Sequence, residues 1–182
     1  MIFLPTQLPD VIQIRPCVHE DDRGYFMEVY QKKTFSEAGI PFEFVQDNHS
    51  SSKQYVLRGL HYQVNHTQGK LIRVVVGEIF DVAVDLRKSS PNFGRWVGVS
   101  LSAENKTLLW IPPGFAHGFF TQSEIADVFY KTTDYFEPAG ERCIRWDDPN
   151  LAISWPIPEN ERPIVSKKDQ AGSFLKDAEV FD

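Results

Sequence analysis

Short runs in which apolar and polar residues alternate follow one another along most of the chain. In the run 79–86, large apolar side chains occupy every second position from Phe80, and Asp81 and Asp85 lie between them. Such alternation predicts a strand with one face packed inward and the other in polar surroundings. Similar extended runs predict strands at 11–18, 25–30, 42–48, 55–61, 70–76, 96–101, 107–111, 117–121 and 126–132.

Residues with turn or capping preferences separate these runs. Gly77 and Glu78 stand between two β-rich runs, which predicts a tight hairpin over 71–86. The polar stretch 19–24 predicts a turn. Thr34 followed by Glu37 is a capping-box pattern, and Gly39 stands where a helix would end, so we expect a short helix over 35–38.

The number and spacing of these strands indicate the fold class. Many short strands with turn signals between them favour an all-β protein, either a β-sandwich or a jelly-roll barrel. Neither a repeat nor a linker divides the sequence, so we expect one domain over 1–182. The Pro-rich part after Trp155 is predicted to pack over the barrel as irregular structure with one short helix.

Composition and charge narrow the functional classes. The chain has 182 residues and a formal net charge of −6, without a block of basic residues. This balance argues against broad binding of nucleic acid or of an anionic membrane, although a few local cations suffice for a small anionic ligand. The first residues resemble no targeting segment, and we expect a cytoplasmic protein whose Cys17 and Cys143 are reduced and buried.

His61 and Arg58 are the first candidates for chemistry. Histidine moves protons readily near neutral pH, although a lone histidine is more often structural. A fixed cation beside a base suits an anionic substrate. Residues three apart in a regular strand face opposite ways, so the pair shares a site only if the backbone is irregular, which Gly59 would allow.

Lys70 begins a predicted strand on the same face as Ile72 and Val74. If that face is the interior, its ammonium group points into an apolar cavity and could stabilise a developing oxyanion. The alternative is a lysine at a strand end that reaches solvent. Parity alone does not decide between the two.

The segment 112–119 delivers His117 into a strand with the spacing Pro-x-Gly-x-x-His, which occurs in the second half of metal-binding cupin motifs. Such a motif also needs a His-x-His pair, and here the corresponding residues are His61 and Gln63. His66 lies in a polar loop and is a poor replacement. The ligand set is incomplete, so we expect no metal.

Two further side chains are candidates for a site, each with a simpler structural explanation. Tyr130 lies in a predicted strand, where tyrosine usually belongs to the core or its rim, but it could donate a proton across a pocket from His61. Asp169 lies in a polar segment that is ordinarily solvated, but it could orient His61. Sequence spacing does not bring Asp169 and His61 together.

Taken together, these motifs resemble one family over essentially the whole chain. The stretches 44–50, 57–61, 68–71, 77–85, 101–106, 110–119 and 166–169 are similar to dTDP-4-dehydrorhamnose 3,5-epimerases. The loop 64–67 departs from the family in composition and length, which bears on loop shape and leaves the chemistry intact.

The resemblance implies a cupin-type jelly roll with short peripheral helices, without metal or cofactor, that acts as a homodimer. It implies inversion of C3 and C5 of dTDP-4-keto-6-deoxyglucose, with His61 as base, Asp169 as its partner, Tyr130 as acid and Lys70 near O4. The implied substrate contacts are Arg23, Glu28, Gln46, Asp47, Asn48, Arg58, Lys70, His117, Glu141 and Lys168. The chemistry agrees with these residue types, because an enolate formed beside the C4 ketone needs a base, a cation and an acid on the opposite face.

Three alternatives remain open at this point. A related enzyme could epimerise only one carbon, either C3 or C5, in another deoxysugar pathway. The chain could also be a cupin that binds nucleotide sugars without catalysis, or, less consistently with its residues, a metal-dependent oxygenase.

Overall fold

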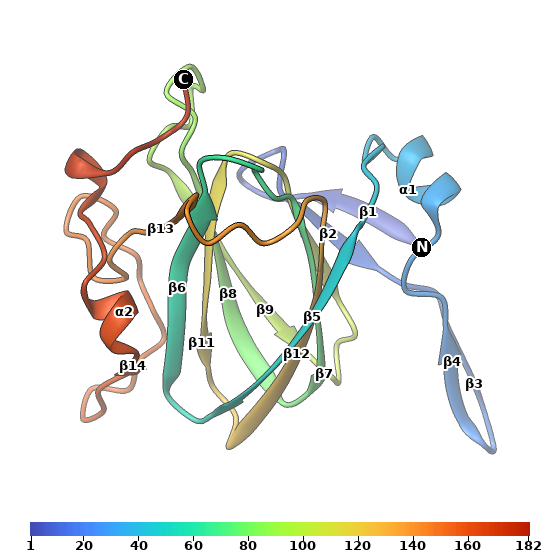
Figure 1. The fold of residues 1–182 in the computed structure, drawn as a ribbon. Coiled ribbons are helices and arrows are strands. Elements are labelled where there is room, and N and C mark those ends of the chain that lie inside the picture. Colours follow the sequence, from blue (N-terminus) through green and yellow to red (C-terminus); the bar gives the residue numbers. More distant parts are fainter.

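The computed structural model describes residues 1–182 and consists mainly of two β-sheets packed face to face (Figure 1). The first sheet has the strand order β1 (Ile2–Pro5), β2 (Ile12–Arg15), β10 (Leu108–Ile111), β7 (Lys70–Val76), β12 (Ile125–Thr132) and β5 (Gln46–Lys53). The second has the order β13 (Glu141–Cys143), β6 (Val56–Gln63), β11 (Phe115–Thr121), β8 (Glu78–Asp85) and β9 (Trp96–Ser102), with β14 (Ile164–Val165) parallel to β6. The predicted all-β barrel is confirmed.

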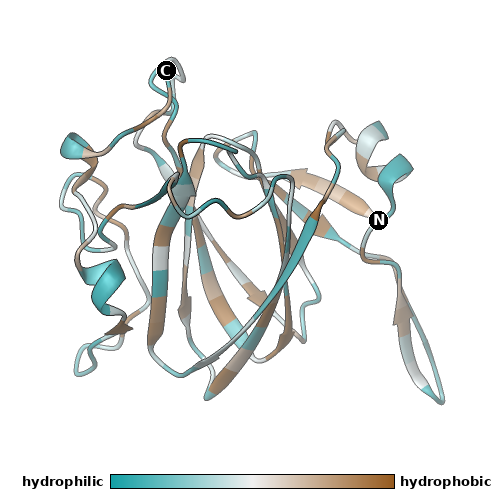
Figure 2. Ribbon diagram, in the orientation of Figure 1, coloured by the Kyte–Doolittle hydropathy of each residue, from teal (hydrophilic) through white to brown (hydrophobic).

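The main core lies between the two sheets. It is a cluster of 15 buried apolar residues contributed by both, among them Ile72 and Val128 from the first sheet and Ile79 and Phe119 from the second. Figure 2 shows hydrophobic residues concentrated on the strands of the barrel. Burial of these side chains is the dominant favourable term that holds the sheets together.

The predicted hairpin over 71–86 is wrong, although both of its strands exist. β7 pairs with β10 and β12, whereas β8 pairs with β9 and β11 in the other sheet. Gly77, with φ of 72°, turns the chain from one sheet to the other. A Cβ at this position would lie 2.0 Å from the carbonyl oxygen of Ile125, so only glycine fits. Alternation predicts a strand but does not choose its neighbour.

The two faces of β8 also differ from the simple expectation. Asp81 and Asp85 belong to the interior face and are fully buried. The apolar face, which carries Val82 and Val84, points outward and packs against the C-terminal part of the chain. Both faces of β8 are therefore buried. The polar environment predicted for the face that carries Asp81 and Asp85 is inside the barrel and not in solvent.

The N-terminal region departs most from the predicted strands. β3 (Val18–Asp21) and β4 (Gly24–Met27) pair only with each other, so most of the expected turn 19–24 is strand. The run 11–18 is divided between β2 and β3, and the run 42–48 is strand only from Gln46. The β3–β4 hairpin extends away from the barrel in Figure 1.

The predicted N-terminal helix is present but begins earlier. α1 spans Lys32–Glu37 with Gln31 at its N-cap and no side-chain capping bond, so Thr34 is not the cap. Phe35 is fully buried and packs against the outer face of the first sheet, which explains why a short helix forms there. Gly39 follows the helix with φ of 85°, as expected.

The C-terminal part covers the outer face of the second sheet, as predicted. It contains α2 (Lys167–Gln170) and the 3-10 turn η1 (Leu175–Asp177). Its apolar side chains pack against the outward residues of β6 and β8, with Trp155 against Phe80 and Phe181 against Tyr62. This packing places α2 beside β6.

The two cysteines are free, but their burial differs from the expectation. Cys17 is exposed and Cys143 is half-buried, so the prediction that both are buried is wrong for Cys17. Cys17 lies between β2 and β3, where the chain leaves the barrel. No helix has both the length and the apolar character needed to cross a bilayer.

Candidate active site

A cavity of about 380 Å³ lies between the sheets and is lined by residues from both of them. Eight of the predicted site residues line it: Gln46, Asn48, Arg58, His61, Lys70, His117, Tyr130 and Glu141. The two-sheet architecture therefore collects, around one space, side chains that are dispersed over much of the sequence.

His61 and Asp169 form a close pair beside this cavity. The Nε2 atom of His61 lies 2.8 Å from Oδ1 of Asp169. The other carboxylate oxygen accepts the Gly59 N–H at 3.1 Å, and α2 begins with Ser166 accepting the Asp169 N–H at 3.1 Å. Burial alone would raise the pKa of Asp169, but these hydrogen bonds lower it below its ordinary value. Asp169 is thus a fixed carboxylate behind an imidazole that faces the cavity.

An irregularity at Gly59 lets Arg58 and His61 line the same cavity. His61 is paired with His117 and Arg58 with Phe119, so β6 has one residue more than β11 across this interval. Gly59 has φ of 114°, and a Cβ there would lie 2.6 Å from Cα of Gly118. The bulge anticipated at this glycine is confirmed.

The side chain of Lys70 points into the barrel and not out to solvent, which decides between the two placements that the alternation of strand residues left open. Lys70 is only 7% exposed, and its Nζ donates to the carbonyl oxygen of His61 at 3.2 Å. Burial lowers the pKa of Lys70 to about 8, against the opposing effect of the carboxylates of Asp81 and Glu141. A desolvated ammonium at this position interacts strongly with negative charge that develops in the cavity.

His117 is held by Asp81, a residue that sequence reasoning placed only on a strand face. Its Nε2 lies 2.8 Å from Oδ2 of Asp81, which is fully buried. Burial raises the pKa of Asp81, and His117 and Lys70 oppose that rise. The sequence signal that could have revealed this role is an aspartate within an otherwise apolar strand, because a buried carboxylate needs a polar or charged partner.

Tyr130 stands on the wall opposite His61. It belongs to β12 in the first sheet, whereas His61 belongs to β6 in the second, and both line the cavity. Burial raises the pKa of Tyr130, so its phenol keeps its proton at neutral pH. A group able to accept a proton and a group able to donate one therefore flank the same space.

Four of the predicted substrate contacts lie outside the cavity lining of this chain. Arg23 is exposed on the β3–β4 hairpin and bonds to Asp21, and Glu28 follows that hairpin. Asp47 pairs with Lys131 at 2.8 Å, outside the cavity lining. Lys168 bonds at 2.5 Å to Glu141, which does line the cavity, so it lies at the rim.

The donor groups of His61, Cys143 and Asp169 lie within 4.8 Å of one another and are the one cluster with the composition of a metal site. Both oxygens of Asp169 are already engaged, and burial raises the pKa of the Cys143 thiol to about 12. A thiol that keeps its proton and a carboxylate whose two oxygens already accept hydrogen bonds are poor metal ligands. His66 bonds to Asp134 at the surface and adds no ligand. The expectation of no metal stays a prediction.

A jelly-roll barrel whose cavity combines a histidine–aspartate pair, a buried lysine and an opposed tyrosine has the features of a cupin-type epimerase. Comparison with known families agrees. Residues 5–177 match the family model of dTDP-4-dehydrorhamnose 3,5-epimerase, and the chain belongs to this family.

Individual relatives support the assignment at high similarity. The dTDP-4-dehydrorhamnose 3,5-epimerase of Pseudomonas aeruginosa is 57% identical over 96% of each chain. The crystal structure of a 3,5-epimerase from Legionella pneumophila with dTDP-4-keto-L-rhamnose superposes with a TM-score of 0.94 at 50% identity, covering 98% of this chain and 94% of that one. ChmJ of Streptomyces bikiniensis, a 3′-monoepimerase, is more distant, with a TM-score of 0.88 at 32% identity over 94% and 87% of the two chains. The protein is an epimerase.

Proposed function

We propose that the protein inverts both C3 and C5 of dTDP-4-keto-6-deoxy-D-glucose and forms dTDP-4-keto-L-rhamnose on the route to dTDP-L-rhamnose. The observation that carries this proposal is the opposition of His61 and Tyr130 across one cavity that also contains Lys70. The Legionella relative crystallised with dTDP-4-keto-L-rhamnose supports the choice of substrate.

The chemistry follows from the C4 ketone, which acidifies the C–H bonds at both C3 and C5. His61 takes the proton from one face, and the C–H electron pair moves to form an enolate with negative charge on O4. The ammonium group of Lys70, held 3.2 Å from the carbonyl oxygen of His61, stabilises that charge. Tyr130 then donates a proton to the opposite face of the same carbon, which inverts it.

Each inversion leaves His61 protonated and Tyr130 deprotonated, so both must exchange protons with solvent before the second carbon is inverted. Asp169 stabilises the imidazolium that forms, as a carboxylate does for other imidazole bases. Since every proton comes from or goes to a protein group or water, the reaction is redox-neutral. No cofactor is required.

The nucleotide part of the substrate is anionic and needs cations at the mouth of the cavity. Arg58 lines the cavity, and Lys168 reaches its rim through Glu141. Arg23 and Glu28 lie on or next to the projecting β3–β4 hairpin instead. We infer that the hairpin of a second copy brings these two side chains to the site.

Two features support such a homodimer. The β3–β4 hairpin pairs with no other strand, yet it carries Tyr25 and Phe26, which are 55% and 72% exposed. Phe129 is 42% exposed and stacks on His49 beside it, on the outer face of the first sheet. Apolar side chains left uncovered in this way are typical of interfaces.

A second candidate is epimerisation at one carbon only, which the similarity to the monoepimerase ChmJ favours. Measuring which carbons of the substrate are inverted and deuterated separates this candidate from inversion at both.

Substitution of the base tests the proposal. His61→Ala is expected to abolish conversion of the substrate and uptake of solvent deuterium while dTDP still binds. His66→Ala is the matched control, because the side chain of that histidine is exposed and bonds only to Asp134. Undiminished deuterium uptake in His61→Ala would refute the assignment of the base.

A further inference from the structure

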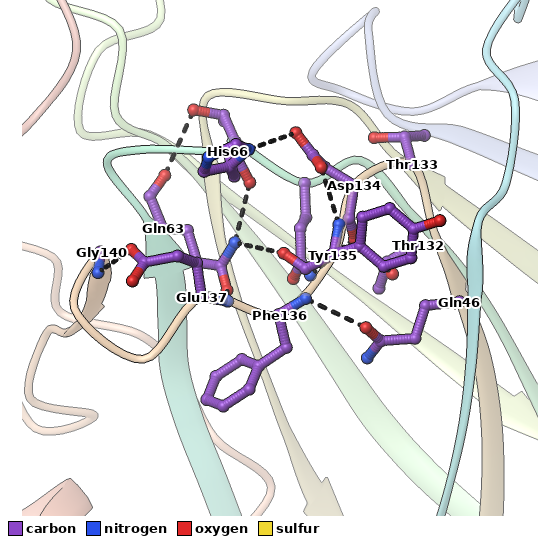
Figure 3. Close-up of polar contacts among 12 residues, drawn as sticks. Gln46, Gln63, His66, Thr132, Thr133, Asp134, Tyr135, Phe136, Glu137 and Gly140 are labelled. Atoms are coloured by element: carbon purple, nitrogen blue, oxygen red, sulfur yellow. Dashed lines mark hydrogen bonds and ion pairs between the residues drawn. The ribbon is translucent and has the colours of Figure 1, made fainter.

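The segment 134–137 follows β12 and is called the rim segment below (Figure 3). Gln68 and Thr132 donate to the carbonyl oxygen of Asp134, and two glutamines from opposite sheets hold the next three residues. Gln46 from the first sheet accepts the N–H of Phe136 at 3.0 Å. Gln63 from the second sheet accepts the N–H of Glu137 at 2.9 Å and donates to the carbonyl oxygen of Tyr135 at 3.2 Å. Three consecutive residues are thus held through their backbone by side chains from opposite sheets.

Gln63 makes more hydrogen bonds to the surrounding backbone than Gln46 does. It is only 3% exposed, and its amide nitrogen also donates to the carbonyl oxygen of His66 at 2.8 Å. Its side chain therefore uses both N–H donors and its oxygen, and it joins the loop 64–69 to the rim segment. A buried amide with all these bonds made is costly to disturb, because every broken bond leaves a polar group without water.

The rim segment forms part of the cavity. Phe136 lines the cavity, although the residue as a whole is 51% exposed to solvent. The segment is not part of either sheet, so the strand ladders do not fix it. Its position depends on side-chain bonds from neighbouring strands, of which those of Gln63 are the most numerous.

The place of Gln63 in the sequence explains why its role is easy to overlook. It lies two residues after His61, where a metal-binding cupin carries the second histidine of its ligand pair. Here the side chain reaches the loop backbone instead. At this position the chain carries a structural amide in place of a metal ligand.

We propose that Gln63 is a positioning residue for the substrate site, which fixes the rim segment so that Phe136 is in place before the nucleotide sugar binds. The proposal rests on the proposed function for the identity of the ligand. Preorganisation of this kind acts on binding, because the unligated protein then loses less conformational freedom when it closes on the ligand.

Gln63→Glu tests this role with almost no change in shape. The carboxylate can still accept the N–H of Glu137, but it presents oxygen where two carbonyl groups need a donor. We expect KM and the dissociation constant for dTDP to rise by about 10-fold or more, with kcat within about threefold of the wild type, since two hydrogen bonds to the loop and the rim segment are lost. Gln63 also lines the cavity, so the added charge weakens binding of an anionic ligand as well, and the hydrogen–deuterium exchange described below separates the two effects. Gln54→Glu is the matched control, because Gln54 donates to the carbonyl oxygen of Gln122 at 2.9 Å and does not line the cavity.

Hydrogen–deuterium exchange provides a readout that does not depend on catalysis. The backbone amides of 134–137 should exchange faster in Gln63→Glu than in the wild type or in Gln54→Glu. Unchanged exchange in this segment would overturn the proposal, and so would faster exchange with unchanged affinity for dTDP. A loss of kcat at constant KM would also overturn it.

If Gln63→Glu does not fold, as judged by circular dichroism, Gln63→Asn replaces it, because it keeps the amide and withdraws it by one methylene. A wild-type chain that binds dTDP but converts no substrate would refute the proposed function. The exchange and dTDP-affinity measurements would still decide the role of Gln63.

Discussion

The imidazole Nε2 of His61 and the carboxylate of Asp169 lie 2.8 Å apart, although 108 residues separate them in the chain. β6 supplies the histidine, and a four-residue helix laid against that strand supplies the aspartate. The C-terminal part therefore supplies a residue of the candidate site as well as covering the sheet. The pairing selects one ring orientation for the proposed base.

Asp169→Asn is expected to lower kcat by about 100-fold or more and to leave dTDP binding within about threefold of the wild type, because an amide neither stabilises an imidazolium nor selects the same tautomer. Asp182→Asn is the control, since Asp182 is exposed, pairs with Lys88 and does not line the cavity. Steady-state kinetics on both variants checks this. Equal kcat values for wild type and Asp169→Asn would remove Asp169 from the mechanism.

The pH dependence should report Lys70. Its pKa is lowered to about 8 by burial, so the folded protein loses this charge as the pH rises through that value. We expect kcat/KM, which follows the free enzyme, to fall on the alkaline side with a midpoint near pH 8. In Lys70→Arg this alkaline limb should disappear, since a guanidinium stays charged. A wild-type profile that is flat through pH 8 would contradict the role of Lys70.

The lowered pKa of Lys70 affects stability in the opposite direction, because folding becomes more favourable over the alkaline range in which activity falls. Between about pH 8 and pH 10.5 the unfolded chain keeps a proton on this lysine that the folded chain has released. Folding therefore becomes more favourable with rising pH as far as Lys70 contributes. Comparing urea unfolding of wild type and Lys70→Met across this range isolates the contribution, and an identical pH slope in the two proteins would argue against a lowered pKa.

Tyr130→Phe should separate the two proton transfers. Without the phenol, His61 can still remove a proton and return a deuteron to the same face, so exchange with solvent continues while inversion fails. We expect product formation to fall by about 100-fold or more, and exchange to fall much less. Tyr55→Phe is a control, because Tyr55 stacks on Phe120 and does not line the cavity. Equal loss of both activities would assign Tyr130 another role.

The contribution of a second copy can be tested by mixing two inactive variants. Arg23→Ala lacks the hairpin cation and His61→Ala lacks the base, so each alone should be strongly impaired. In a mixed dimer, one site combines an intact His61 with an intact Arg23 from the other chain. About a quarter of wild-type activity is expected after random reassociation at equal amounts. No recovery, with mixed dimers present by native mass spectrometry, would place Arg23 in its own chain's site.

The sequence predicted the strands of the barrel well where one face is apolar, as in β7 and β12. It did not predict their partners, and the supposed hairpin at Gly77 connects two sheets. It also placed Asp81 only on a strand face, because alternation does not show whether a face meets water or an interior cavity.

The candidate site was predicted mainly by residue types and by the family resemblance. The bulge at Gly59 was anticipated from the need to bring Arg58 and His61 together, and the register confirms it. The family resemblance implied the partnership of His61 with Asp169, but residue spacing alone did not, because α2 reaches β6 only after the chain has passed over the second sheet. The structural role of Gln63 carried no sequence signal, since its bonds go to the backbone.

The most direct test of the central claim is proton NMR of dTDP-4-keto-6-deoxy-D-glucose incubated with the protein in D2O. Epimerisation at both centres predicts loss of the H3 and H5 signals and a product with both carbons inverted and deuterated. Deuterium and inversion at one carbon alone, or no exchange at either, would contradict it.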